Sequence, residues 1–246
     1  MINTYNESDL HLTLKKIYAL ETNGKTEVPL AGTSWICDIL DENGNAVEIQ
    51  TSNLSALTEK AEYILGSGKK IKIVHPVLQE KFIEMTDAGG NTIYRKKSPK
   101  KATIYDSLRG MTKICTLFLN PNCTLEVLFV RATEIRRQTE KETQIFNKSR
   151  RHLKNWVPTG KRLDEILSKK NFSKPSDFTD LLCGAEKTES GLFRLCDVSK
   201  AVREKYGARN ARWANLLVWI LLKMDLIEIK EIRGRSKFYQ LTEEKL

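Results

Sequence analysis

Two Asn-Gly pairs, at residues 23–24 and 43–44, constrain the fold of the N-terminal part of this chain more than any other feature. Such pairs favour the tight turns of β-hairpins, because glycine adopts the left-handed backbone conformation at little cost. The first pair follows a helical pattern over residues 7–20. Runs of strand length lie at residues 26–30, 34–40 and 46–50. The sequence therefore predicts a helix followed by a meander of three short strands.

A second helix and further strands are expected after the meander. Residues 55–65 repeat apolar side chains at helical spacing, and residues 70–74 alternate as a strand that should end before Pro76. We expect further strands at residues 81–85, 91–95 and 125–130 and a helix at residues 104–119. Helices on the faces of such a sheet indicate an α/β or α+β class, so residues 1–135 are expected to form one domain of this kind.

The C-terminal part, residues 161–246, shows a different order of elements. Short helical patterns at residues 163–167 and 178–182 come first. A short helix, a glycine turn, a longer amphipathic helix over residues 210–224 and two strands follow. This is the order of a winged helix-turn-helix. Residues 136–160 are highly charged without a long apolar run, so we expect them to link two domains.

The net charge of +10 is distributed unevenly along the chain. Residues 1–94 carry a net charge of −5, whereas residues 95–155 carry +10 and residues 156–246 carry +5. A basic region of this size is typical of proteins that bind a polyanion, and an acidic region elsewhere suits cation binding. Solubility alone is the alternative explanation of the same charges.

Composition argues against several classes of protein. The longest apolar run, near residues 216–222, is much shorter than the ~20 residues that span a bilayer, and the first residues contain no export signal. Five cysteines without C-x-x-C spacing, together with only three histidines, argue against a disulfide framework and a zinc site. We therefore expect a protein of the reducing cytoplasm that contacts no membrane.

The sharpest chemical signal is a pair of carboxylates in the second hairpin. If its loop consists of residues 42–44, with Gly44 in the left-handed conformation, Asp38 lies directly opposite Glu48. Glu48 and Gln50 then share one face of their strand. Two adjacent carboxylates repel unless a cation lies between them, and Mg²⁺ is the first candidate. A two-residue turn would separate the carboxylates, and an ordinary exposed acidic hairpin is the alternative.

Asp38, the Glu48-x-Gln50 pattern on the next strand, and the helix and strand that follow resemble the PD-(D/E)xK nuclease superfamily, which has the restriction-endonuclease-like fold. With the basic stretch 95–101, the chain looks like a group of uncharacterised bacterial proteins that join such a core to a winged helix. The resemblance implies an α/β fold with a mixed sheet flanked by helices, and a smaller C-terminal winged helix-turn-helix domain.

The resemblance also implies metal-dependent hydrolysis of phosphodiester bonds, with Mg²⁺ or Mn²⁺ polarising the phosphate and lowering the pKa of a bound water. Asp38, Glu48 and the carbonyl of Ile49 would bind the ion. Gln50 stands where the family usually has a lysine, and a neutral amide supplies no charge, so Lys60 on the following helix is the candidate to replace it. The expected catalytic residues are Glu7, Asp38, Glu48, Gln50 and Lys60.

Some of these assignments have structural alternatives. Glu7 would also stabilise the dipole of its helix, and Lys60 would also serve as an ordinary solvated lysine. His11 lies one turn after Glu7 on the same face, so one interpretation brings it to the site; the other, which we favour, is a partly buried structural histidine.

The basic residues predict contacts with nucleic acid, and double-stranded DNA is the expected partner. Residues 95–101 hold five Lys/Arg, which suits phosphates or a minor groove. The second helix of a helix-turn-helix meets base edges at its N-terminal end. Trp213 and Trp219 are expected in the core. The candidate DNA-binding residues are Lys96, Lys97, Lys100, Lys101, Arg209, Asn210, Arg212, Arg233, Arg235 and Lys237.

Three functions are consistent with the sequence. The first is a metal-dependent DNA endonuclease whose winged helix binds the target; many nucleases of the family it resembles cut as dimers, so a homodimer is one expected arrangement. The second is a non-enzymatic DNA-binding or regulatory protein with a degenerate nuclease core, because Gln50 replaces the usual lysine. The third is an adaptor in which both domains bind other proteins.

Overall fold

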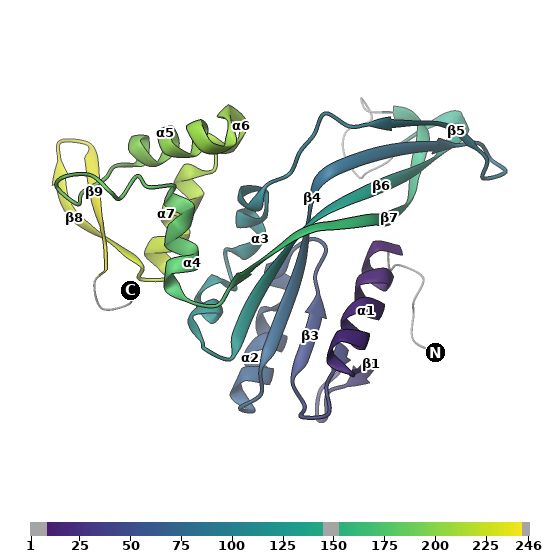
Figure 1. Cartoon of the computed structure of the whole chain (residues 1–246), viewed down its shortest axis with the longest axis horizontal. Coiled ribbons are helices and arrows are strands. Elements are labelled where there is room, and N and C mark those ends of the chain that lie inside the picture. The colour runs from purple at the N-terminus through teal and green to yellow at the C-terminus, as the bar shows by residue number, and fades with distance from the viewer. Residues whose placement is uncertain (1–8, 145–152, 243–246) are drawn as a thin grey trace.

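Helices flank one mixed sheet in the computed structural model, which describes residues 9–144 and 153–242 (Figure 1). Helix α1 (Asp9–Thr22) precedes a meander of β1 (Lys25–Pro29), β2 (Ile36–Leu40) and β3 (Ala46–Ile49). The short η2 (Leu54–Leu57) and α2 (Thr58–Gly66) connect β3 to β4 (Ile71–Thr86), which runs parallel to β3. The helix and three-stranded meander predicted from the Asn-Gly pairs are confirmed.

The seven-stranded sheet has the order β1-β2-β3-β4-β6-β7, and β5 (Thr92–Lys97) pairs with the outer half of β4. Strand β6 (Cys123–Gln144) lies parallel to β4, and β7 (Leu153–Phe172) returns antiparallel along β6. Three short helices precede β6: η3 (Ile104–Ser107), α3 (Leu108–Met111) and η4 (Cys115–Leu119). This architecture confirms the α/β class with a mixed sheet flanked by helices.

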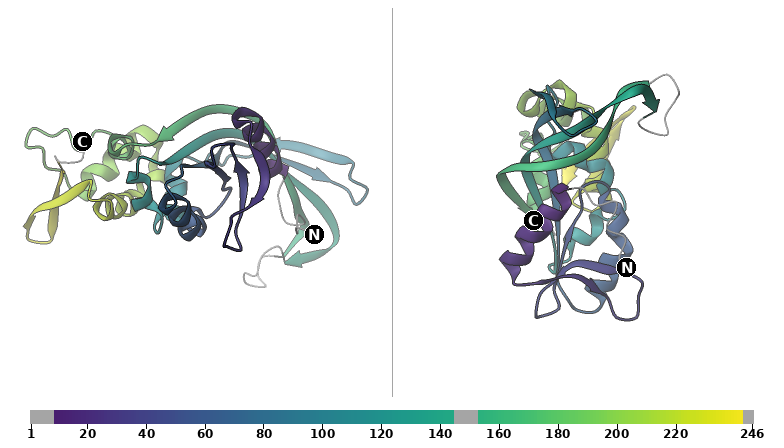
Figure 2. Two further views of the ribbon diagram at one scale, coloured as in Figure 1. Left: turned by 90° about the horizontal axis from the view of Figure 1, so that it is seen from below. Right: turned by 90° about the vertical axis from the view of Figure 1, so that its right-hand side faces the viewer.

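Each face of the sheet is covered by its own hydrophobic core. On one face, α1 buries Leu10, Leu14 and Tyr18 against β2, β3 and β4, because residues four apart share one side of a helix. On the other face, α2 and the helices near α3 form a larger core. Figure 2 shows α1 and α2 on opposite sides of the strands. The candidate hairpin β2–β3 is therefore enclosed between two helices.

The C-terminal unit packs on the face of the sheet opposite α1. It contains α4 (Pro175–Thr179), η6 (Asp180–Leu182), α5 (Leu195–Tyr206), α6 (Ala208–Ala211), α7 (Ala214–Lys223), β8 (Ile227–Arg233) and β9 (Ser236–Leu241). The ring of Phe178 lies 5.2 Å from that of Phe172 on β7 and 6.0 Å from that of Phe118 on η4. The two parts of the chain thus share one core. In the described ranges, no helix combines the length and apolar character needed to cross a membrane.

The expected division of the chain differs from the structure. Residues 136–144 belong to β6 and residues 153–160 to β7, so the described part of the expected linker 136–160 forms sheet. Residues 163–167, expected to be helical, also lie in β7. The reason is that β7 contains bulges, which space its inward side chains about three residues apart and mimic a helical pattern. The sheet therefore extends to Phe172, well beyond residue 135.

Strand β4 also continues through Pro76, where the sequence predicted its end. The carbonyl of Val74 accepts a hydrogen bond from the N–H of Gln50, the residue that follows β3. Every second residue of β4 therefore directs its backbone N–H and C=O toward β3. Pro76 is the next residue of β4 whose backbone is directed toward β3. Because β3 has already ended there, the missing N–H of the proline leaves no ladder bond unmade.

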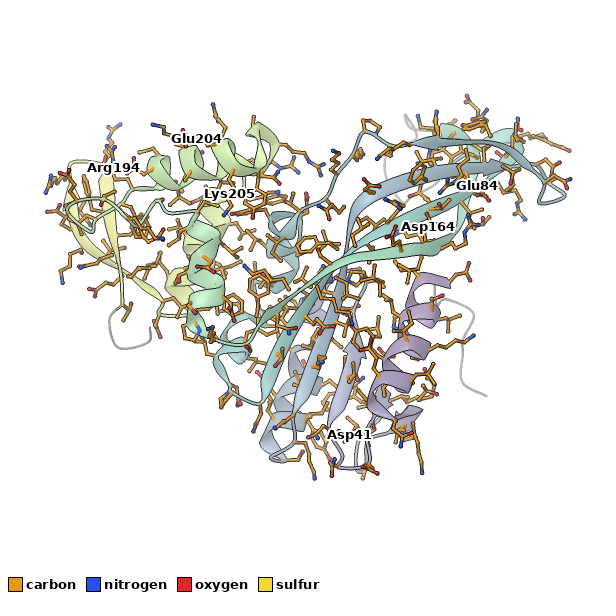
Figure 3. All side chains as sticks on the ribbon, viewed as in Figure 1. Asp41, Glu84, Asp164, Arg194, Glu204 and Lys205 are labelled. Carbon is orange, nitrogen blue, oxygen red and sulfur yellow. The ribbon has the colours of Figure 1, made fainter. Side chains whose placement is uncertain are left out.

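The outer parts of β4, β5, β6 and β7 extend beyond the helices as an arm (Figure 1). Many basic side chains of this arm are paired with carboxylates on neighbouring strands, and Figure 3 shows two of these acids, Glu84 and Asp164. The pairs join Arg131 and Lys97 to Glu80, Arg162 to Glu84, and Arg95 to Asp164. Much of the positive charge of residues 95–162 is therefore offset within the sheet.

Candidate active site

The hairpin between β2 and β3 has the register of the three-residue loop, one of the two registers that the sequence allowed. Ile39 pairs with Val47, and the turn closes between Asp41 and Asn45, with Gly44 at a φ of 79°. The Asp41 carboxylate accepts the N–H of Asn45 at 2.7 Å, which fixes the turn further. The three-residue loop is thus confirmed, and its register puts residues 38 and 48 directly opposite each other.

Asp38 and Glu48 lie where the two strands separate beyond the Ile39–Val47 pair. The Asp38 carboxylate accepts the backbone N–H of Ile49 at 2.8 Å, and the Glu48 carboxylate accepts the backbone N–H of Asp38 at 3.3 Å. Each side chain thus replaces a ladder bond that the separated strands no longer make.

Glu48 is only 3% exposed and is paired with Lys60 of α2, whose Nζ lies 2.6 Å from the carboxylate. Lys60 also donates to the carbonyl of Ile36 at 2.6 Å, so its ammonium is held between β2 and β3. Burial raises the pKa of the Glu48 carboxyl above its ordinary value, and the charge of Lys60 offsets this only in part. Lys60, predicted from the sequence as a candidate, is therefore brought to Glu48.

Asp38 is contacted from the opposite helix, α1. Nζ of Lys15 lies 3.4 Å from one carboxylate oxygen, and Nε2 of His11 lies 3.3 Å from the other. Burial alone would raise the pKa of the Asp38 carboxyl, but hydrogen bonds from His11 and Ile49 and the charge of Lys15 outweigh it and hold the pKa below its ordinary value. Two neighbouring carboxyls thus have pKa values shifted in opposite directions, a pattern that suits different chemical roles.

Gln50 differs from the other members of the predicted motif. It lies just beyond the end of β3, and its side-chain amide donates to the carbonyl of Asn53 at 3.0 Å. His75 holds the backbone here, because its Nδ1 lies 2.5 Å from the Gln50 carbonyl and its Nε2 lies 3.0 Å from the Ser107 hydroxyl. A carbonyl only accepts, so Nδ1 carries the proton. The structure brings Lys60 of α2 to Glu48, whereas the Asp38 carboxylate faces Lys15 and His11 of α1 on the other side of the sheet. The two acids are neighbours in register but do not share one face as expected, and the Gln50 amide bonds elsewhere.

The oxygens at this site suit a hard divalent ion in kind. They are two carboxylates and the carbonyl of Ile49, and Mg²⁺ is usually bound by one or two carboxylates with waters and substrate phosphates completing its shell. The Ile49 carbonyl already accepts a hydrogen bond from α1. Within residues 9–144 and 153–242, no group of three or more His, Cys, Asp or Glu side chains is placed to hold a metal. The oxygens are thus of the kind that Mg²⁺ prefers, but each carboxylate already faces an ammonium, Lys15 for Asp38 and Lys60 for Glu48.

Most of the predicted DNA-binding residues lie on the surface. The exposed members are Lys96, Lys97, Lys100, Lys101, Arg209, Arg212, Arg233, Arg235 and Lys237. Lys97 is paired with Glu80 at 3.2 Å and Arg233 with Glu231 at 2.6 Å, whereas Lys96 lies over the ring of Tyr94. Glu7 lies outside the described residues.

Residues of α6 that were predicted to contact DNA instead contact other parts of the protein. Asn210 is 5% exposed, and its amide oxygen accepts a hydrogen bond from Thr103 at 2.7 Å, so it cannot contact a base and that assignment is wrong. Arg209 contacts Asp106 at 3.0 Å and donates to the carbonyl of Lys101. These residues join the C-terminal unit to the segment that follows the arm.

Lys15 and His75 are polar residues of the site that sequence reasoning did not assign, as is Glu27, which accepts a hydrogen bond from Lys15. Lys15 lies one turn after His11, so continuing the spacing of Glu7 and His11 by four residues would have found it. His75 lies two strands away from Asp38 in the sheet order, and its partner Ser107 comes from a distant helix. A contact between residues this far apart in the sequence cannot be predicted from a local pattern.

Comparison with known proteins gives the following matches. Residues 8–173 match the model of a family described as a domain of unknown function, DUF8091. An uncharacterized protein of Treponema pallidum (strain Nichols) is 28% identical over 149 residues, which are 61% of this chain and 58% of that protein. This chain thus spans little more than half the length of that relative. No solved structure matches the chain. The matched family region ends next to Phe172, so it contains the whole sheet and the candidate site.

Proposed function

This chain belongs to the DUF8091 family, and we propose that it hydrolyses phosphodiester bonds in nucleic acid with the help of a divalent metal ion. The order of the elements supports a restriction-endonuclease-like core for this reaction. A helix, a three-stranded meander, a second helix and a strand parallel to β3 follow one another. The two acids lie on the second and third strands, as the resemblance implies.

The observation that carries the proposal is the position of Lys60. Its ammonium lies 2.6 Å from the Glu48 carboxylate, although it comes from α2 and not from the strand position of Gln50. A positive charge beside the acids stabilises the negative charge that develops on a phosphate during hydrolysis. Lys60 thus supplies the charge that the amide of Gln50 lacks.

Asp38 and Glu48 would hold the metal ion. Because its pKa is held low, Asp38 is ionised at neutral pH and can bind a cation. Burial raises the pKa of the Glu48 carboxyl and Lys60 offsets this only in part, so a bound cation would further stabilise the ionised carboxylate. When bound, the ion would polarise the phosphate and lower the pKa of a bound water.

The C-terminal unit supports binding of nucleic acid. Its helices α5, α6 and α7 are followed by the hairpin β8–β9, and Phe193 pairs with Tyr239 on β9 as a third, minimal strand. This arrangement is consistent with a winged helix. The hairpin presents Arg233, Arg235 and Lys237 to solvent, which suits contacts with a phosphate backbone.

A second candidate function is binding of nucleic acid without hydrolysis. It is favoured by the fact that both carboxylates already have ammonium partners, Lys15 for Asp38 and Lys60 for Glu48. In this case the acids and lysines stabilise the hairpin, and the basic surfaces carry the function.

A cleavage assay distinguishes the two functions. The full chain is incubated with plasmid, single-stranded DNA and RNA in Mg²⁺ or Mn²⁺, and the variants are Glu48→Gln and Lys60→Met. Glu59→Gln is the matched control, because Glu59 is the neighbour of Lys60 on α2 and is exposed. We expect cleavage by the wild type and the control, and a loss of at least about 100-fold in Glu48→Gln, the size of effect typical for a group that acts in the transition state.

Binding is measured on the same variants in EDTA, and their melting curves show whether they are folded. Cleavage lost in folded Glu48→Gln with binding retained supports the nuclease. If the wild type binds but cleaves none of the substrates, hydrolysis is refuted and the second candidate stands.

A further inference from the structure

An exposed tryptophan lies on the C-terminal unit, at a position that the sequence assigned to the core. Trp219 of α7 is 46% exposed. It belongs to an exposed stripe of α7 and the residues before it, formed by Arg212, Asn215, Trp219 and Lys223. Spacings of three and four residues place these side chains on one side of the helix. The opposite side carries Leu217, Ile220 and Leu221 into the core, which corrects the expectation for Trp219.

A hollow of about 560 Å³ lies next to this stripe, between the loop after Gln50 and the segment of α3. It is lined by Ser52, Asn53, Ser55, Arg109, Gly110, Thr112 and Lys113. A Cβ atom added to Gly110 would lie 3.3 Å from the backbone nitrogen of Leu54 and 3.5 Å from the carbonyl of Ser52. The glycine therefore lets α3 approach the loop closely.

Contacts connect the tryptophan through this hollow to Gln50, which follows Glu48 by two residues in the chain. Nζ of Lys223 lies 5.4 Å from the centre of the Trp219 ring and donates to the carbonyl of Thr112 at 2.7 Å. Thr112 lines the hollow, and Asn53 on its other side accepts the amide of Gln50 at 3.0 Å. Figure 1 shows α7 beside α3, where these contacts occur. We call this continuous surface the track, formed by Trp219, Lys223, the hollow and Gln50.

The track is positively charged without compensation. Arg109, Lys113 and Lys223 have no carboxylate partner among the residues that the structure describes. The basic residues of the arm differ, because Arg131, Arg162 and others are paired with acids across the strands. Uncompensated cations attract phosphates, since binding then displaces counterions and not an internal partner.

We propose that the track binds a single strand of nucleic acid and leads it toward the candidate active site. The proposal deepens the nuclease function and rests on it. A base stacks on the face of Trp219, and the phosphates that follow contact Arg109 and Lys113. An exposed indole face accepts an unstacked base of any sequence, whereas the bases of a duplex are already stacked on one another. The occupant is therefore a single strand, in place of the duplex expected from the sequence.

Binding is tested on the full chain in EDTA, so that cleavage does not interfere. Fluorescence anisotropy is measured with a labelled 12-nucleotide oligothymidylate, the corresponding oligouridylate and a 12-base-pair duplex. Trp219→Ala should weaken single-strand binding about five- to 150-fold, the range found for loss of one stacked base. Trp219→Phe keeps an aromatic face and should retain most of the affinity.

The double variant Arg109→Ala with Lys113→Ala should lower the slope of log affinity against log salt by about 1.4, because each lost phosphate contact removes about 0.7 for single strands. The control is Lys16→Ala with Lys25→Ala, which removes the same two positive charges as the Arg109/Lys113 variant. Both lysines are exposed and lie in the acidic N-terminal part of the chain. The control should leave the slope unchanged.

Equal weakening in the control and in the Arg109/Lys113 variant would overturn the track, as would duplex binding that exceeds single-strand binding or an unchanged affinity in Trp219→Ala. Binding of both oligothymidylate and oligouridylate supports the track, and their ratio shows which sugar is preferred. The track and the nuclease fail separately: cleavage that depends on Glu48 with an unaffected Trp219→Ala refutes only the track, and binding through Trp219 without cleavage refutes only the nuclease.

Discussion

Replacing Lys60 with methionine should destabilise the protein by an amount that depends strongly on pH. Methionine keeps the length of the lysine stem, and the Lys60 side chain is only 10% exposed, so packing changes little. What is lost is the ammonium beside Glu48, a carboxylate with 3% of its surface exposed. A buried charge whose partner is removed is strongly destabilising.

The loss in free energy of unfolding caused by Lys60→Met has an upper limit, because Glu48 can take up a proton and become neutral. A carboxyl with an ordinary pKa of 4.5 costs about 3.4 kcal/mol to protonate at pH 7 and about 0.7 kcal/mol at pH 5, at 1.36 kcal/mol for each pH unit. We therefore expect Lys60→Met to lower the free energy of unfolding by about 3 kcal/mol at pH 7 and by about 1 kcal/mol at pH 5. Adding Glu48→Gln should restore most of the difference at pH 7, since no buried charge is left.

Urea denaturation followed by tryptophan fluorescence measures these differences. Lys69→Met is the control, because Lys69 is exposed and its ammonium donates to the carbonyl of Asn43 in the β2–β3 turn, not to a buried carboxylate. It should change the free energy of unfolding by less than about 0.5 kcal/mol. A loss in Lys60→Met that is equal at pH 5 and pH 7, or no recovery in the double variant, would refute the reasoning.

Two further predictions concern the backbone that supports the site. Burial lowers the pKa of His75, so the unfolded chain binds a proton below about pH 6.5 that the folded chain does not. Stability from this residue is therefore present above that pH and lost as the pH falls, by at most about 2 kcal/mol at pH 5, and His75→Asn should reduce this pH dependence in denaturation curves. Gly44→Ala should cost about 1–2 kcal/mol, because Gly44 has a φ of 79°, whereas Gly66→Ala within α2 should be neutral or stabilising; equal effects would contradict the left-handed turn.

The sequence was most informative where local chemistry sets the geometry. The Asn-Gly pair at residues 43–44 predicted the turn of the β2–β3 hairpin and allowed two registers, and the structure has the one with the three-residue loop. Lys60 was identified as a candidate from its place on the helix after the motif. These predictions needed only the neighbouring residues.

The sequence was least informative where distant segments decide. Leu163 and Ile166 are three residues apart, which suggested a helix, yet they pack beside the α1 core because bulges interrupt β7. Asn210 looked like a base-contacting residue at a helix start, but its surroundings are set by Thr103, more than 100 positions earlier. Trp219 was assigned to the core because α7 is strongly apolar, and only the packed structure shows which side of that helix is covered.

The packing of Phe178 against Phe118 and Phe172 limits how this protein can be divided. An independent domain has its own hydrophobic core, but here the C-terminal helices and the sheet share one core. Any protein that keeps the sheet and ends near residue 173 needs another cover for that surface. Replacing the segment after residue 173 with one from another protein would therefore give a folded protein only if the new segment covers this surface of the sheet with aromatic or aliphatic side chains.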